Sequence, residues 1–155
     1  MSAVPYIAVA GPGDATPELT WIAEEVGAGL AESGAVVVTG GLGGVMEAAC
    51  RGAKSRRGRT LGILPGADRE AANGWVDIAL PTGMGEMRNA LIVRACDGLV
   101  AIGGGPGTLS EIALALKGGR PVVGLGSWDI EGMVRADEPR DAVERVIRLT
   151  SSALP

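Results

Sequence analysis

The chain has 155 residues, enough for one domain with a substantial buried core. Its formal net charge is −4, from 14 basic and 18 acidic side chains, which argues against nucleic acid as the main partner because such binding depends on clustered Lys and Arg. The absence of histidine excludes a Ser-His-Asp triad, a histidine general base and the common His-containing metal sites, and we predict no metal site. Residues 1–5 lack the features of a signal peptide and no apolar run is as long as a membrane helix, so we expect one cytoplasmic domain over residues 1–155.

Short apolar runs recur along the chain and are typical of strands. They cover residues 6–10, 35–38, 60–64, 76–80, 99–102 and 121–125. Most are apolar throughout rather than alternating, which indicates strands that are covered on both faces. The sequence therefore predicts a parallel sheet with helices on both sides.

Amphipathic segments fill the intervals between these runs. The first helix is predicted to begin at Thr16 as N-cap, with Pro17 at the first helical position. Further helices are predicted around residues 46–53, 86–95, 109–116 and 143–149. Alternating strands and helices favour right-handed crossovers. The fold class is therefore α/β, a Rossmann-like three-layer sandwich with a parallel sheet of about six or seven strands.

The 26 glycines cluster where predicted strands pass into predicted helices. The clusters are Gly11-Pro12-Gly13, Gly40–Gly44, Gly83 with Gly85, and Gly103–Gly107. In a parallel sheet these junctions share one edge, where ligands bind, and the amides at a helix start suit an anion. Tight turns are the alternative explanation, but two such loops on one edge favour a phosphate site. The dinucleotide fingerprint and the Walker lysine are both missing.

The segment Gly103–Glu111, with the sequence GGGPGTLSE, carries a more specific signal. It resembles the Pro-Gly-Gly-x-Gly-Thr-x-x-Glu motif of the "Lonely guy" (LOG) family of phosphoribohydrolases, formerly described as lysine decarboxylase-like. Segments 40–47, 62–65 and 87–89 are also similar to that family. The chain departs from LOG at Gly103, Asn89 and Glu86, where LOG proteins have proline, lysine and histidine. Residues 82–89, followed by 101–105, resemble a short branch of the superfamily that includes the molybdenum cofactor carrier proteins.

This resemblance implies a homodimeric or homotetrameric carrier of a phosphate-bearing, nucleotide-like or pterin ligand. The bound ligand would be the molybdenum cofactor or an AMP-like nucleotide. The alternative is a LOG-type phosphoribohydrolase that splits a nucleoside 5′-monophosphate with Arg88 and Glu111 as catalytic residues, so the question of enzyme activity stays open. A third hypothesis is single-stranded DNA binding, because DNA-processing proteins contain a related domain, and the acidic charge counts against it.

The predicted ligand contacts lie in the glycine loops and at the helix starts. They are Gly11, Gly41, Gly43, Gly44, Thr82, Gly83, Arg88, Asn89, Gly104, Gly105, Gly107 and Thr108. Arg88 stands near a helix start, where a cation opposes the helix dipole, and this misfit favours a role in binding an anion. Glu111 has two interpretations, a catalytic carboxylate or the third residue of a capping box that begins at Thr108.

Overall fold

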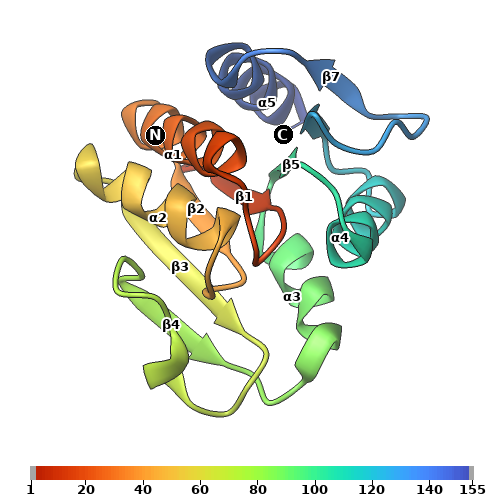
Figure 1. Ribbon diagram of the computed structural model, residues 1–155. Helices are drawn as coiled ribbons and strands as arrows, with labels where there is room; N and C mark the ends of the chain where they lie inside the picture. Colours follow the sequence, from red (N-terminus) through yellow and green to blue (C-terminus); the bar gives the residue numbers. More distant parts are fainter. Residues whose placement is uncertain (1–2, 154–155) are drawn as a thin grey trace.

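Seven parallel strands form one sheet in the computed structural model, which describes residues 3–153 (Figure 1). The strands are β1 (Tyr6–Ala10), β2 (Val36–Thr39), β3 (Arg59–Leu64), β4 (Ile78–Pro81), β5 (Gly98–Ile102), β6 (Val122–Leu125) and β7 (Val134–Ala136). All six predicted strands are confirmed, with small shifts at their ends. The seventh, β7, is a short edge strand whose central Arg135 is exposed, so its sequence carries little hydrophobic signal.

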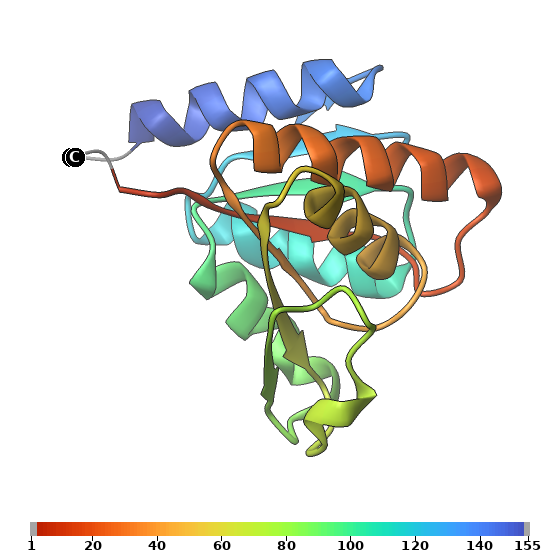
Figure 2. The same ribbon diagram turned by 90° about the vertical axis from the view of Figure 1, so that its left-hand side faces the viewer.

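Helices cover both faces of this sheet. They are α1 (Pro17–Glu32), α2 (Val45–Ser55), α3 (Arg88–Ala95), α4 (Pro106–Lys117) and α5 (Pro139–Ala153), with 3₁₀ segments η1 (Arg69–Ala71) and η2 (Gly85–Met87). Figure 2 shows α1 and α5 on one side of the sheet and α3 and α4 on the other. The predicted α/β three-layer sandwich is confirmed.

Two apolar clusters, one on each face, hold these layers together. Along β1, Ile7 and Val9 pack with α1, α2 and α5, whereas Ala8 and Ala10 pack with α3 and α4. Successive strand residues point to opposite faces, so a strand buried on both sides must be apolar throughout. This confirms the prediction that the apolar runs are strands covered on both faces. Cys50 and Cys96 are buried free thiols within these layers.

The helix starts follow the sequence signals in one case and overturn them in another. Thr16 caps α1 as predicted, since its Oγ1 accepts from the Leu19 amide at 3.2 Å. The predicted capping box at Thr108 is wrong, because Gly105 is the N-cap of α4 and Pro106 its first residue. The preset φ of proline starts the helix earlier and leaves Thr108 inside the first turn.

The buried face of α4 is partly polar. Ala113 is exposed, and the buried residues of α4 are Thr108, Glu111, Ile112 and Ala115. Two polar side chains therefore face inward on this helix. Thr108 and Glu111 lie in the first two turns of α4, near the carboxyl end of β5.

Strand order reverses between β1 and β5. The order in the sheet is β4-β3-β2-β1-β5-β6-β7. Strands β2 to β4 therefore lie on one side of β1, and β5 to β7 lie on the other. A crevice forms at the carboxyl ends of the strands at such a switch point, because the crossover helices leave in opposite directions.

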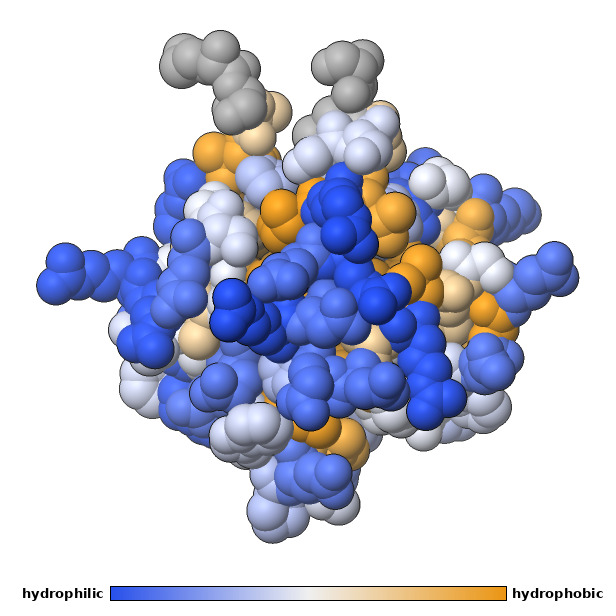
Figure 3. Space-filling view, turned by 90° about the horizontal axis from the view of Figure 1, so that it is seen from above, coloured by the Kyte–Doolittle hydropathy of each residue, from blue (hydrophilic) through white to orange (hydrophobic). Residues whose placement is uncertain are grey.

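The surface over the outer helices is largely hydrophilic. Figure 3 views the side that carries α1 and α5, where hydrophobic residues form only small separate patches. Ion pairs such as Arg145–Asp141, at 2.8 Å, occupy the exposed face of α5. None of the helices in residues 3–153 has both the length and the apolar composition to cross a membrane.

Candidate functional site

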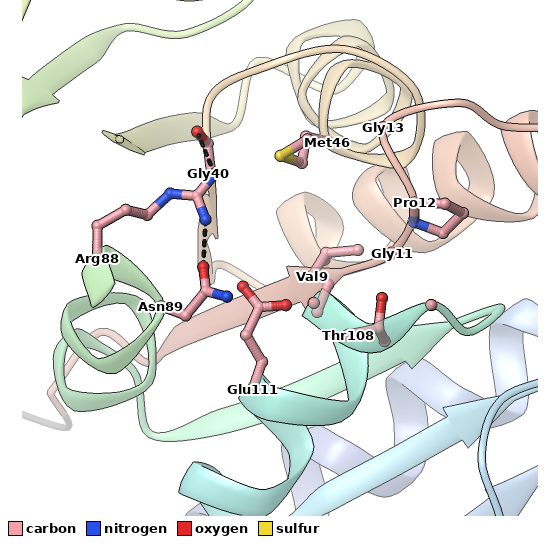
Figure 4. Close-up of a pocket in the computed structure, with 13 residues that line it drawn as sticks. Val9, Gly11, Pro12, Gly13, Gly40, Met46, Arg88, Asn89, Thr108 and Glu111 are labelled. Carbon is pink, nitrogen blue, oxygen red and sulfur yellow. Dashed lines mark hydrogen bonds between the residues drawn. The ribbon is translucent and has the colours of Figure 1, made fainter. Parts of the chain in front are cut away.

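A pocket of about 190 Å³ lies at the switch point between β1 and β5 (Figure 4). Its walls come from the ends of β1 and β2 and from the starts of α2, α3 and α4. This volume encloses one part of a small ligand, such as a phosphoribosyl group or a bicyclic ring, rather than a whole nucleotide. The pocket is open on one side, so the rest of a ligand can extend outward.

The N-terminus of α4 forms one wall, with Gly105, Gly107 and Thr108 lining the pocket. Within residues 3–153 the amides of Gly107 and Thr108 donate to no oxygen. Free amides in the first turn of a helix carry the positive end of its dipole. This wall can therefore hold an anion with hydrogen bonds from the main chain.

Gly105 and Gly107 are not required by packing or by backbone conformation. A Cβ added at either would meet no atom within 4 Å, and neither has a positive φ. Other residue types would fit the chain at both positions. Both glycines line the pocket, and the absence of a side chain allows a ligand to approach the backbone closely there.

Arg88, the first residue of α3, forms the opposite wall and is fixed by neutral acceptors. Its Nε donates to the carbonyl of Ile63 at 2.9 Å, one terminal nitrogen donates to Asn89 Oδ1, and the other lies 3.5 Å from the carbonyl of Gly40. Partial burial lowers its pKa, while the charges of Glu111 and Glu86 act in the opposite direction. Arginine stays charged at any physiological pH, so the pocket contains a positioned cation without an ion-pair partner in the described chain.

Gly40, which was not among the predicted contacts, makes room for this guanidinium. A Cβ at Gly40 would stand 2.6 Å from Arg88 Nη2 and 2.7 Å from Met46 Sδ. Both Gly40 and Met46 line the pocket. Gly40, which follows β2, therefore leaves the space that the Arg88 guanidinium occupies.

Asn89 connects the two helices that flank the pocket. Its Oδ1 accepts from Arg88 of the same helix, and its Nδ2 donates to Ser110 Oγ of α4 at 3.0 Å. The side chain is 6% exposed and lines the pocket. Asn89 therefore fixes the distance between the Arg88 wall and the α4 wall.

Glu111 lies on α4, with its carboxyl group directed into the pocket between Asn89 and Thr108 (Figure 4). The residue is 8% exposed. Burial raises the pKa of its carboxyl group to about 7, and the charge of Arg88 offsets only part of this rise. Within residues 3–153 its carboxyl group accepts no hydrogen bond, and it lies beside the Asn89 side chain at the edge of the pocket.

The predicted site residues divide into two groups. Those that line the pocket are Gly11, Arg88, Asn89, Gly105, Gly107, Thr108 and Glu111. Those that do not are Gly41, Gly43, Gly44, Thr82, Gly83 and Gly104. The pair that would be catalytic in a hydrolase, Arg88 and Glu111, belongs to the first group.

Internal contacts occupy much of the second group. The Gly41 amide donates to Thr39 Oγ1 at 3.1 Å, and Gly44 packs so closely that a Cβ there would lie 2.4 Å from the carbonyl oxygen of Pro12. Thr82 Oγ1 donates to the carbonyl of Leu64 at 2.7 Å. Their predicted roles in ligand binding stay predictions, while their observed contacts shape the loops behind the pocket.

Trp128, on the loop between β6 and β7, supports the α4 wall from outside. Its indole N–H donates to the Gly105 carbonyl at 3.3 Å, and a Cβ at Gly104 would lie 2.8 Å from the same nitrogen. Gly104 is therefore needed for the approach of the indole. No local pattern in the sequence links position 128 to this loop.

A model of the SLOG cluster4 family matches residues 4–153. The chain belongs to the SLOG cluster4 family. This confirms the resemblance to the LOG-like superfamily and to its short cofactor-carrier branch. A relative in Archaeoglobus fulgidus, described only as an uncharacterized protein, is 46% identical over 142 residues, which make up 91% of this chain and 93% of the relative.

Solved structures of molybdenum cofactor binding and carrier proteins are also similar to this SLOG cluster4 protein. It is similar to the molybdenum cofactor binding protein of Rippkaea orientalis, with 38% identity, a TM-score of 0.89 and coverage of 96% of this chain and 98% of that one. It is also similar to the molybdenum cofactor carrier protein of Chlamydomonas reinhardtii, with 36% identity, a TM-score of 0.88 and coverage of 96% and 99%.

Glu111 makes the stability of this SLOG cluster4 protein depend on pH. Its pKa is about 7 in the folded chain against an ordinary value of 4.5, so the folded state holds the proton more tightly. The stabilising effect of that proton is complete below about pH 4.5 and is lost as the pH rises through about 7. We expect this residue to lower the free energy of unfolding by about 3 kcal/mol across that interval.

The measurement is urea unfolding of the wild type and of Glu111→Gln from pH 4.5 to pH 8 without ligand. Glutamine does not ionise, so the stability of the variant should fall less over this interval. Identical pH profiles for the two proteins would contradict the assigned environment of Glu111.

Proposed function

We propose that this protein binds a small phosphate-bearing ligand, nucleotide-like or pterin, and carries it without changing it chemically. The observation that carries the proposal is the pair Gly105 and Gly107, which line the pocket and have open space where a side chain would stand. We further propose that residues 1–155 act as one domain, and that the protein is cytoplasmic, in keeping with its free buried thiols.

The phosphate would occupy the α4 wall. The amides of Gly107 and Thr108 would donate to its oxygens, and the helix dipole would stabilise its charge. Arg88 would add a positive charge from the opposite wall, where its hydrogen bonds to the Ile63 carbonyl and to Asn89 fix the guanidinium. Because these donors are fixed before binding, little ordering is required when the anion enters.

The similar proteins of known ligand support a pterin as cargo. One relative is described as a molybdenum cofactor binding protein and another as a molybdenum cofactor carrier protein. We propose the same cofactor as a ligand of this chain, with an AMP-like nucleotide as the other candidate. Both have a phosphate group joined through an oxygen-containing ring to a nitrogen heterocycle, so the phosphate can bind at the helix start while the rest of the ligand extends from the open pocket.

We also propose that the chain works as a homodimer or homotetramer. The edge strand β4 carries Ile78 and Leu80, whose side chains are 60% and 48% exposed. Their β3 neighbours in register, Leu61 and Ile63, pack into the cluster beneath α3 and α4. The apolar face of the sheet thus extends to β4, beyond the part that α3 and α4 cover. A second copy of the chain would cover this exposed part.

Gly107→Ala tests the proposed phosphate site. The added methyl group would stand where a phosphate oxygen approaches, so we expect affinity for ribose 5-phosphate and AMP to fall by at least about 10-fold. The variant should fold at least as stably as the wild type, because alanine stabilises a helix relative to glycine by up to about 1 kcal/mol. Isothermal titration calorimetry and urea unfolding measure the two effects.

Gly66→Ala is the matched control, since Gly66 also has open space at its Cβ and lies outside the pocket. It should bind both ligands as the wild type does. Equal binding by Gly107→Ala and Gly66→Ala, or no binding by the wild type, would contradict the proposal. Chromatography of the AMP samples separates a carrier, from which AMP is recovered intact, from a phosphoribohydrolase, which releases the base.

The assembly is tested by replacing Ile78 and Leu80 with lysine in one variant. Charges on this edge strand would prevent a second copy from covering it, so native mass spectrometry should show monomers where the wild type shows dimers or larger assemblies. Trp21→Ser is the control, because Trp21 is 56% exposed on α1, away from β4. A monomeric wild type, or an unchanged assembly in the lysine variant, would refute this interface.

A further inference from the structure

The segment that leads into α4 has little local support. Gly103, Gly104 and Gly105 are consecutive, and Gly103 has a φ of +64°. Gly105 is the N-cap of α4 and has no side chain to cap the helix, in contrast to Thr16 at the start of α1. Glycine loses more conformational freedom on folding than any other residue. Contacts from elsewhere in the chain are therefore needed to fix the start of α4.

Two hydrogen bonds to the end of β6 and the loop after it supply such contacts. The Gly103 amide donates to the carbonyl of Leu125, the last residue of β6, at 3.1 Å. The indole N–H of Trp128 donates to the Gly105 carbonyl at 3.3 Å. The same carbonyl accepts from the Leu109 amide of α4 at 3.0 Å. Trp128 thus holds the N-cap peptide group from outside the helix and leaves the amides of the first turn free.

The surroundings of Trp128 favour this role over core packing. The side chain is 42% exposed and belongs to neither of the two apolar clusters. It also lines a hollow of about 140 Å³ beside the connection between β6 and β7. A Cβ at Gly104 would lie 2.8 Å from Trp128 Nε1 and 3.0 Å from its Cδ1. The N–H edge of the indole therefore lies directly against the glycine segment.

We propose that Trp128 is a positioning residue that sets the anion affinity of the pocket, because its indole N–H fixes the Gly105 carbonyl and with it the first turn of α4. Trp128 does not line the pocket, so it acts through the main chain. Donors that are held in place before binding require less ordering when the anion enters. Loss of the indole bond would let the glycine segment move and would raise that cost. This inference rests on the proposed function and adds to it a residue from a distant loop.

Trp128→Phe tests the role, because it removes the indole N–H and keeps an aromatic ring. We expect the dissociation constant for ribose 5-phosphate, measured by calorimetric titration, to rise about 3- to 10-fold, as for the loss of one hydrogen bond. Trp75→Phe is the matched control. Trp75 is 41% exposed, lies outside the pocket, and within residues 3–153 forms hydrogen bonds through its backbone alone. This control should bind ribose 5-phosphate as the wild type does.

Hydrogen exchange of the Leu109 amide separates positioning from a general loss of stability. Leu109 and Trp128 donate to the same carbonyl, so the Leu109 amide should exchange at least about 5-fold faster in ligand-free Trp128→Phe than in the wild type. The amide of Ala115, further along α4, should exchange at the same rate in both proteins. A variant that is merely less stable overall would speed the exchange of both amides.

The indole resonances of the wild type give a measurement that needs no variant. The Trp128 indole N–H should shift when the ¹⁵N-labelled protein is saturated with ribose 5-phosphate, because its acceptor lies at the N-cap of the helix that binds the anion. The indole resonances of Trp21 and Trp75 should stay in place, since neither residue lines the pocket.

The outcomes distinguish this inference from the proposed function. The positioning role is overturned, and the anion site stands, if the wild type binds ribose 5-phosphate and Trp128→Phe binds it as tightly as Trp75→Phe does. An affinity that falls without faster Leu109 exchange, or a Trp128 indole resonance that does not move on saturation, also overturns it. If the wild type binds neither ribose 5-phosphate nor AMP, both the proposed function and this inference are wrong.

Discussion

The whole arrangement depends on the close approach of three backbone segments at Gly11. A Cβ at this position would lie 2.5 Å from Val45 Cγ1 and 2.7 Å from the carbonyl oxygen of Ile102. Val45 is the first residue of α2, which follows β2, and Ile102 is the last residue of β5. Because β2 and β5 flank β1 in the sheet, Gly11 joins the end of β1 to the segments that follow both of its neighbours. The Val45 amide completes this contact by donating to the Pro12 carbonyl at 3.0 Å. Any side chain at Gly11 would separate these segments and open the rim on which the pocket is built.

On that rim, the chain positions two opposite charges without pairing them. Arg88 belongs to α3 and Glu111 to α4, helices that pack on the same face of the sheet and are linked through Asn89. An ion pair between them would neutralise both and remove the electrostatic difference between the ends of the pocket. Instead, backbone carbonyls hold Arg88, and Glu111 lies in a poorly solvated position that raises its pKa. The fold loses stability at this point and gains a site with a fixed polarity, which is the pattern expected where a ligand completes the contacts.

Much of the fold and part of the site could be predicted from local patterns. The apolar runs gave six strands because a buried parallel strand must be apolar on both faces, and Thr16 with Pro17 marked the start of α1. At α4 two local signals competed, and Pro106 prevailed over Thr108 because its ring fixes φ and it has no N–H to lose. Arg88 was recognised from its conflict with the helix dipole. Gly40, Met46 and Trp128 were missed because each reaches the site across the sheet edge or from a distant loop, and these contacts depend on tertiary packing alone.

The most direct test of an anion-binding site at the start of α4 is an NMR titration of the ¹⁵N-labelled protein with ribose 5-phosphate, followed through the amide resonances. The free amides of Gly107 and Thr108 should show the largest shifts, since they would gain an acceptor on binding. The Gly41 amide already donates to Thr39, and its resonance should move little. Shifts concentrated in residues 40–44, or no saturable shifts in residues 105–108, would contradict an anion site at this helix terminus.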